Sequence, residues 1–178
     1  MPSSPPCERV PIGRLRLLAE SYRRLTGKPL PGNILPVGAA SAANIAFSSS
    51  AFAAEAAPAD DEALHAALWS APFAIVAHGT EADPIFFYGN RYALRSFEMD
   101  FDEFARLPSR LSAEPLNQEA REQALRKVSA QGYIDGYSGM RIASSGRRFM
   151  ITDCTIWNLV DADGVAHGQA AIFVEQQA

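Results

Sequence analysis

The sequence predicts an α+β domain in which a five-stranded antiparallel sheet carries helices on one face and follows an N-terminal amphipathic helix. Two short apolar runs, residues 73–77 and 84–88, flank a turn that contains Gly, Asp and a following Pro, which is typical of a β-hairpin. From residue 133 to residue 175 the hydrophobic period becomes two, and turn clusters divide this segment into three strands. Between the hairpin and residue 133, apolar residues recur at helical spacing. One antiparallel sheet with helices therefore accounts for the order of elements.

Length and charge limit the class of protein. A chain of 178 residues suits one domain of ordinary size with an extension. The formal charge of −4, with no basic face evident downstream of Lys28, argues against sequence-independent binding to nucleic acid. No apolar run reaches the roughly 18 residues of a membrane span. Cys7 and Cys154 lie too far apart for a metal motif, and they indicate no disulfide framework, so we expect a reducing, cytoplasmic setting.

The first third of the chain predicts one helix and a linker. Leu15, Leu18, Tyr22 and Leu25 recur at helical spacing, and Gly27 is placed to end that helix. Residues 30–59 are rich in Ala and Ser and have no sustained period, which predicts a linker or a loose insertion. A signal peptide is not expected there, because polar residues interrupt the apolar centre. We therefore divide the chain into an N-terminal helix with its linker, 1–59, and a folded domain, 60–178.

Helix starts are predicted from capping residues. Asp60 or Asp61 can cap a short helix before the hairpin, and Asn90 can cap the helix that follows it. Asp100 stands three residues before Glu103, as in a capping box. A longer helix is expected from Asn117, which would cap it, to Gly132. The apolar side of this helix is predicted to hold Ala120, Ala124, Leu125 and Val128.

Four stretches together carry a resemblance to a known family. They are HGTEADPIFFYGN (78–90), LPSRLSAEP (107–115), GYIDGYSGMRIASSGRRF (132–149) and TIWNLVDADGVAHGQAAIF (155–173). In this order they resemble the bacterial MEKHLA-domain proteins, a PAS-like family, over about residues 61–173. The segment SYRRLTGKPL in the N-terminal helix also looks like the family's N-terminal part. The string that gives the family its name is absent here, because it belongs to plant homeodomain-leucine-zipper members.

The resemblance implies a PAS-like sensor or interaction domain. Such domains hold small molecules between sheet and helices, and light-oxygen-voltage members hold flavin there, with a reactive cysteine in an NCRFL motif. In this chain Ser109 stands where that thiol would be, so a cysteinyl-flavin adduct is not expected. Trp157 and Asn158 resemble a strand motif whose asparagine contacts the flavin ring in those domains. Gln169 lies on the last predicted strand, where those domains also have a glutamine. By resemblance, the residues that would bind flavin or another planar small molecule are therefore Ser109, Arg110, Trp157, Asn158 and Gln169.

Each of these residues also has a simpler interpretation. Arg110 could neutralise an anionic ligand or tie its loop to Glu114. The amides of Asn158 and Gln169 suit the edge of a planar heterocycle, although Asn158 could face solvent instead. Trp157 is more often a core residue than a cofactor platform. The buried-hydrophobe interpretation is also preferred for Cys154.

Three functions follow, from different classes. The leading hypothesis is a cytoplasmic PAS-like sensor or regulatory module that binds a small molecule between sheet and helices and can form a homodimer. The alternative is a ligand-free protein-interaction or dimerisation module. It would use an outer face of Met150, Ile156 and Val160, together with the N-terminal helix, to hold a second copy or a regulatory protein.

The third function is a small enzyme built on His78, Asp83 and Tyr88. We favour a simpler reading in which His78 is a turn histidine bonded to its own loop. Ser109 has no recognisable catalytic partners, and the three histidines share no metal-ligand spacing. We therefore expect neither catalysis nor a metal site.

Overall fold

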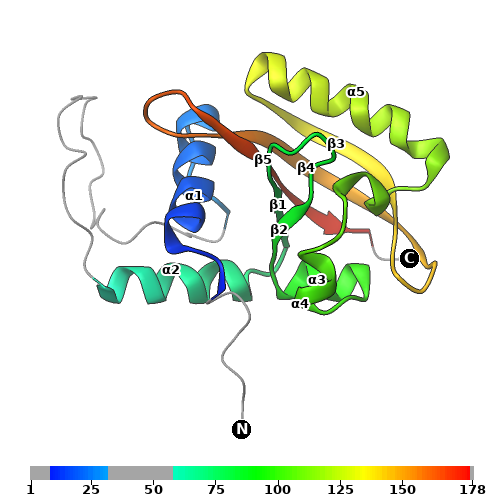
Figure 1. Cartoon of the computed structure of the whole chain (residues 1–178), viewed down its shortest axis with the longest axis horizontal. Helices are drawn as coiled ribbons and strands as arrows, with labels where there is room; N and C mark the ends of the chain where they lie inside the picture. The colour runs from blue at the N-terminus through cyan, green and yellow to red at the C-terminus, as the bar shows by residue number, and fades with distance from the viewer. Residues whose placement is uncertain (1–8, 32–57, 177–178) are drawn as a thin grey trace, which may run out of the picture.

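The structure, a computed structural model, describes residues 9–31 and 58–176 and centres on one antiparallel sheet (Figure 1). Its strands are β1 (Ala74–His78), β2 (Phe86–Gly89), β3 (Tyr133–Ile142), β4 (Arg148–Val160) and β5 (Ala166–Glu175). They lie in the order β2-β1-β5-β4-β3, and each neighbouring pair is antiparallel. The predicted fold class and the opening hairpin are confirmed.

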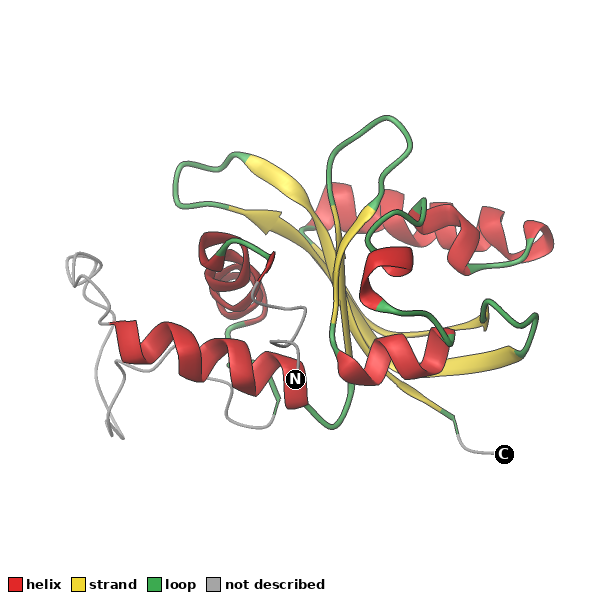
Figure 2. Ribbon diagram, turned by 60° about the horizontal axis from the view of Figure 1, so that its bottom comes forward, coloured by secondary structure: helices red, strands yellow, loops and turns green. Residues whose placement is uncertain are grey.

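Helices cover both faces of this sheet (Figure 2). They are α1 (Ile12–Thr26), α2 (Pro58–Ser70), α3 (Arg91–Phe97), α4 (Phe101–Phe104), a 3-10 helix η2 (Ser109–Ser112) and α5 (Pro115–Gln131). We call the face beneath α3, α4 and α5 the inner face. The opposite, outer face is covered by α1, with α2 packed beside α1. The N-terminal helix therefore packs on the sheet that it was expected only to precede.

The alternating side chains of the strands build a core on each face. Ile75 and Ile172 point to the outer core, while Val76 and Phe173 point to the inner core. Burial of each such side chain contributes about 1.5–3 kcal/mol. The two cores share the sheet as their common wall, so β1 and β5 have apolar residues at nearly every position.

Helix α1 docks on the outer face through one aromatic side chain. The indole of Trp157 donates from Nε1 to Ser21 Oγ at 3.1 Å, and its ring meets Tyr22 edge-on at 4.9 Å between centroids. Leu15 and Leu18 are fully buried beside them. The apolar outer face at this point is thus covered by the chain's own helix.

The predicted interaction face of Met150, Ile156 and Val160 is wrong, and a β-bulge explains why. The register between β4 and β5 shifts between Thr152 and Thr155, where Asp153 has φ of 50°. Such a bulge adds one residue and reverses the alternation of side chains beyond it. Ile156 consequently lies in the inner core, whereas Trp157 points outward.

Several helix ends agree with the capping residues, and two starts do not. Asn90 caps α3, Asp100 forms the capping box of α4 with Glu103, and Gly27 ends α1 in a left-handed conformation. However, α2 begins at Pro58 and α5 at Pro115, so Asp60, Asp61 and Asn117 lie inside helices and do not cap them. Proline lacks an amide hydrogen and suits the first turn, which accounts for these earlier starts.

Part of the N-terminal prediction falls outside the described residues. Most of the Ala- and Ser-rich linker, residues 32–57, belongs to that part, as does Cys7. Leu30, where the linker was expected to begin, is buried in the outer core. The domain boundary after residue 59 stays a prediction. Within residues 9–31 and 58–176, no helix has the length and apolar character needed to cross a membrane.

Asn90 joins four segments at the centre of the fold. Its Oδ1 accepts from the backbone N–H groups of Ile75 and Ala93, both at 3.0 Å. Its Nδ2 donates to the carbonyl oxygens of Leu68, at 3.2 Å, and Phe73, at 2.8 Å. The side chain is fully buried and uses its whole hydrogen-bonding capacity.

We therefore expect Asn90→Ala to lower the free energy of unfolding by about 3 kcal/mol or more, because each buried polar group left without a partner costs about 1–3 kcal/mol. Urea unfolding followed by circular dichroism measures the change. Asn158→Ala is the matched control: Asn158 is only partly buried and donates one hydrogen bond to the backbone of α5. Equal losses in the two variants would contradict the central role of Asn90.

Candidate functional site

A small cavity of about 40 Å³ lies between the inner face of the sheet and α5. Its walls are mainly apolar, and the apolar lining residues are Val76, Phe86, Phe97, Leu125, Ile151, Cys154, Ile156, Ala170, Ala171 and Phe173. Five polar residues complete the lining: His78, Ser112, Arg121, Arg141 and Gln169. The cavity therefore combines apolar walls with a few convergent polar groups, as ligand sites do.

Two arginines reach this cavity from opposite walls. Arg121 comes from α5 and Arg141 from β3, and each residue is 7% exposed. Arg141 donates from Nη1 to the carbonyl oxygen of Met140 at 2.9 Å, and its guanidinium lies 5.6 Å from the ring centroid of Tyr137. In the part of the chain that the structure describes, neither arginine forms an ion pair with a carboxylate.

Burial and the like charge of Arg141 lower the pKa of Arg121 to about 10. At pH 7 this guanidinium still carries its proton. Two positive charges thus share one apolar space. Tyr137 and Glu122 raise the pKa of Arg121 by less than burial and Arg141 lower it, and in the described residues no carboxylate forms an ion pair with either arginine.

His78 presents an unpaired ring nitrogen to the same cavity. The ring bonds through Nδ1 to the carbonyl oxygen of Gly79 at 2.9 Å, so Nδ1 carries the proton and Nε2 is an acceptor. The buried Nε2 atom has no hydrogen-bond partner among residues 9–31 and 58–176. Burial lowers the pKa of His78, with Arg121 adding to the effect, which keeps the ring neutral at pH 7.

A glycine lets β5 approach this histidine. Gly168 has φ of 137°, and a Cβ at that position would lie 1.9 Å from the carbonyl oxygen of His78. Only a residue without a side chain allows this contact. The close approach places Gln169 directly opposite His78 in the ladder of β1 and β5.

The amides of Gln169 and Asn158 tie α5 to the sheet. Gln169 donates from Nε2 to Asn158 Oδ1 at 3.0 Å and to Ser129 Oγ at 3.2 Å. Asn158 donates from Nδ2 to the carbonyl oxygen of Val128 at 3.0 Å. Asn158 therefore does not simply face solvent, and both amides are engaged with each other and with the helix.

The other residues predicted for the site lie elsewhere. Ser109 is buried in η2, outside the cavity lining. Arg110 is half exposed and pairs through Nε with both carboxylate oxygens of Asp83, at 3.1 and 3.2 Å, and not with Glu114. Trp157 points to the outer face. Of the five predicted residues, only Gln169 lines the cavity, and Asn158 lies next to it.

The residues of the enzyme hypothesis are not assembled either. Asp83 binds Arg110, and no hydrogen bond links it to His78 in the described chain. Tyr88 belongs to the outer core, on the other side of the sheet from the ring of His78. Cys154 is buried, and burial raises the pKa of its thiol to about 12, so it is the small core residue that was expected.

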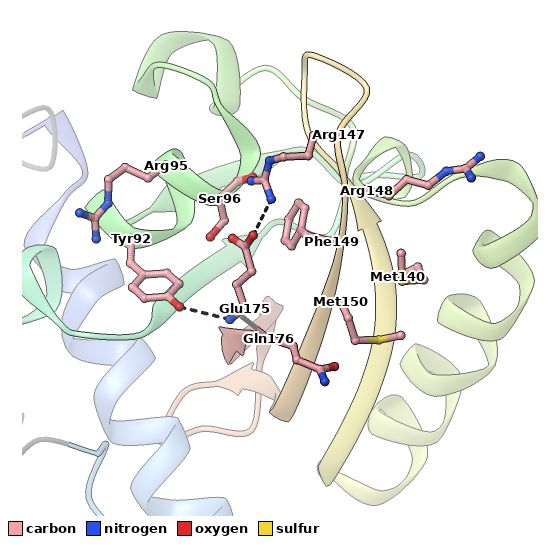
Figure 3. A pocket seen from close by; sticks show the side chains of 10 residues that line it. All are labelled: Tyr92, Arg95, Ser96, Met140, Arg147, Arg148, Phe149, Met150, Glu175 and Gln176. Carbon is pink, nitrogen blue, oxygen red and sulfur yellow. Dashed lines mark hydrogen bonds and ion pairs between the residues drawn. The ribbon is translucent and has the colours of Figure 1, made fainter. Parts of the chain in front are cut away.

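A larger hollow of about 890 Å³ opens at the surface near the C-terminal end of β5 (Figure 3). Its lining residues are Tyr92, Arg95, Ser96, Met140, Arg147, Arg148, Phe149, Met150, Glu175 and Gln176. Arg147 pairs with Glu98, at 2.6 Å, and with Glu175, while the hydroxyl of Tyr92 accepts from the backbone N–H of Glu175 at 3.2 Å. Arg147 is therefore already neutralised within the chain, in contrast to the cavity arginines.

Arg121 and Arg141 were missed in the sequence, although one pattern contains the first of them. Arg121 precedes Ala124, Leu125 and Val128 at helical spacing, and it shares their buried side of α5. Ala120, which was assigned to that side, is exposed. A charged residue within an apolar stripe is the signal that indicates a buried charge.

Comparison with known families agrees with this geometry. The sequence profile of the MEKHLA domain matches residues 12–178, which is most of the chain and includes α1. This chain belongs to the MEKHLA-domain family. The resemblance that the four stretches indicated is confirmed.

Solved structures show that the MEKHLA domain has a PAS-like fold. A light-oxygen-voltage domain from a study of a flavin analogue aligns with a TM-score of 0.55 and 19% identity, covering 67% of this chain and 88% of that one. The PAS domain of a protein from Colwellia psychrerythraea aligns with a TM-score of 0.55 and 15% identity, covering 62% and 92%. These similarities concern the fold alone. No curated protein matches the chain.

The cavity of this MEKHLA domain does not fit a flavin ring. Sites for molecules of that size have volumes of about 300–1,000 Å³, against about 40 Å³ here. The amides that could contact a flavin are occupied by α5. The flavin-like expectation for Ser109, Arg110 and Trp157 has no geometric support, because these side chains do not meet in one space.

The lowered pKa of His78 predicts a loss of stability in acid. The unfolded chain keeps a pKa near 6.5, while burial holds the folded value below it. As the pH falls from 6.5 towards the folded value, the unfolded chain binds more protons, so the free energy of unfolding decreases. Above pH 6.5 the contribution is fully present.

The imidazole of His78 should accordingly titrate below 6.5 in NMR spectra, and His78→Gln should flatten the dependence of stability on pH in this window. His167→Gln is the matched control, since His167 is exposed and pairs with Asp161 at 2.8 Å. Titration of His78 at or above its ordinary pKa would contradict the assignment.

Proposed function

We propose that this MEKHLA domain is a cytoplasmic sensor or regulatory module that binds a small molecule between the inner face of the sheet and α5. The observations that support the proposal most are the Nε2 atom of His78, which is buried without a hydrogen-bond partner among the described residues, and the burial of Arg121 and Arg141 beside it. Buried polar groups in native proteins are nearly always hydrogen-bonded. A bound ligand would supply the missing partners.

Helix α5 is the element that would report binding. Of its described side chains only Arg121, Ala124 and Val128 are buried, so its apolar attachment to the sheet is small. The amides of Asn158 and Gln169 hold it by hydrogen bonds across the cavity. A ligand larger than about 40 Å³ would move α5 outward, and a shifted surface helix is a signal that a partner can read.

The proposal predicts that small molecules stabilise the protein by entering this cavity. Native mass spectrometry and absorbance of freshly purified protein test for a co-purified molecule, and a thermal-shift panel of metabolites tests for added ones. Ala171→Leu fills the cavity and should abolish the shifts, whereas Ala130→Leu on the exposed side of α5 should preserve them. Repeatedly empty protein, together with no shift from any compound, would refute ligand binding.

A second candidate function is protein interaction through the hollow near β5, either with a second copy of this chain in a homodimer or with a regulatory protein. This hollow holds the partly exposed side chains of Met140 and Met150, and β3, which carries Met140, is an edge strand of the sheet. Partly exposed methionines suit adaptable protein contacts. Met150→Asp should then weaken self-association in sedimentation equilibrium, and a strict monomer at high concentration would remove the homodimer version.

A further inference from the structure

Among the described residues, neither arginine of the cavity is in an ion pair, and this limits what the cavity can bind. Arg121 and Arg141 are the buried arginines of the described part of the chain, and both line the same cavity. The other arginines in ion pairs, such as Arg110 and Arg147, meet their carboxylates at or near the surface. Both buried guanidinium groups therefore lie at one apolar cavity, where a negatively charged group would stabilise them.

Resting on the proposed function, we infer that the ligand is a small organic carboxylate whose anionic group lies between Arg121 and Arg141. Buried charges in proteins are paired, because an ion removed from water is strongly destabilised without a counter-ion. In the described part of the chain Glu122 acts on Arg121 without forming an ion pair, and no carboxylate pairs with either arginine, so a carboxylate of the ligand would fill that role. A guanidinium offers two parallel N–H donors that match the two oxygens of a carboxylate.

The other residues that line the cavity indicate the chemistry of the remainder of this ligand. Phe97, Ile151 and Phe173 present apolar surface, which suits a hydrocarbon portion next to the carboxylate. The free Nε2 of His78 is an acceptor, which suits a hydroxyl or N–H group on the ligand. The volume of about 40 Å³ admits only a few non-hydrogen atoms before α5 moves. A short carboxylic acid with a hydroxyl group combines these features.

Pairs of acids and their neutral amides give the sharpest test. Lactate, propionate and butyrate should each raise the melting temperature of the intact protein, while lactamide, propionamide and butyramide should have little effect. The two molecules of each pair have nearly the same shape, so the difference isolates the negative charge. Isothermal titration calorimetry then gives the dissociation constant of the best acid.

Substitution of the arginines supplies an independent readout. Arg121→Met and Arg141→Met keep much of the side-chain volume and remove the charge. Each should weaken acid binding about tenfold or more, since a hydrogen bond to a charged group contributes more than a neutral one. Arg126→Met on the exposed side of α5 and Arg148→Met on β4 are the matched controls and should bind normally.

The unliganded variants also distinguish a ligand site from ordinary structure. Without added acid, Arg121→Met should melt about 2–4 °C or more above the parent protein, because an uncompensated buried charge has been removed. A lower melting temperature of both methionine variants, together with unchanged acid binding, would overturn the inference. The comparison of acids with amides on the unaltered protein needs no variant, so it remains decisive if a variant fails to fold.

Failure of this inference can be separated from failure of the proposed function. If amides stabilise the protein as well as acids, or if a neutral molecule co-purifies with it, the cavity binds a ligand but the carboxylate assignment is wrong. Binding of inorganic phosphate without binding of any acid likewise overturns the carboxylate. If the purified protein is empty and nothing in the wider panel binds, both proposals are refuted.

Discussion

The hydrogen bonds of Asn90 are the constraint on which the rest of this MEKHLA domain depends. One amide joins the end of α2, the approach to β1, β1 itself and the first turn of α3. These segments would otherwise bury backbone groups without partners, which is costly in an apolar core. By holding β1 in place, Asn90 also determines where His78 emerges, at the far end of that strand. Asn90 therefore helps to determine the position of the cavity, although it does not line the cavity.

The second organising feature is the bulge at Asp153, which gives β4 a different set of side chains on each side. Before the bulge, Phe149 and Ile151 point to the inner face; beyond it, Ile156 takes that role and Trp157 turns outward. The same irregularity therefore supplies an apolar wall to the cavity and a docking site for α1. A regular strand of this length would place Trp157 beneath α5, where the cavity now lies.

The sequence predicted those features that depend on residues close together in the chain. It did not predict the features that depend on contacts between distant residues. The cap at Asn90 and the box at Asp100 depend on groups three residues away, so their residue types were sufficient. Nothing local reveals the pairing of Arg110 with Asp83, which are 27 residues apart. The inward turn of Ile156 required a bulge that composition does not mark. Arg121 was overlooked because a charged residue on a helix is ordinarily assigned to solvent.

The contrast between the two hollows explains why size alone is a poor guide to the site. In the larger one, Arg147 is held by two carboxylates and a backbone oxygen, so no further ligand is needed to satisfy its charge. In the smaller one, a histidine nitrogen is buried without a hydrogen-bond partner in the described chain, and two buried arginines there form no ion pair. Stability alone would favour apolar residues at such positions, since buried unpaired charge opposes folding. Retaining two arginines there is the pattern of a site in which stability is given up for binding, and the outer core, which α1 and α2 build with the sheet, lies on the opposite face from this loss.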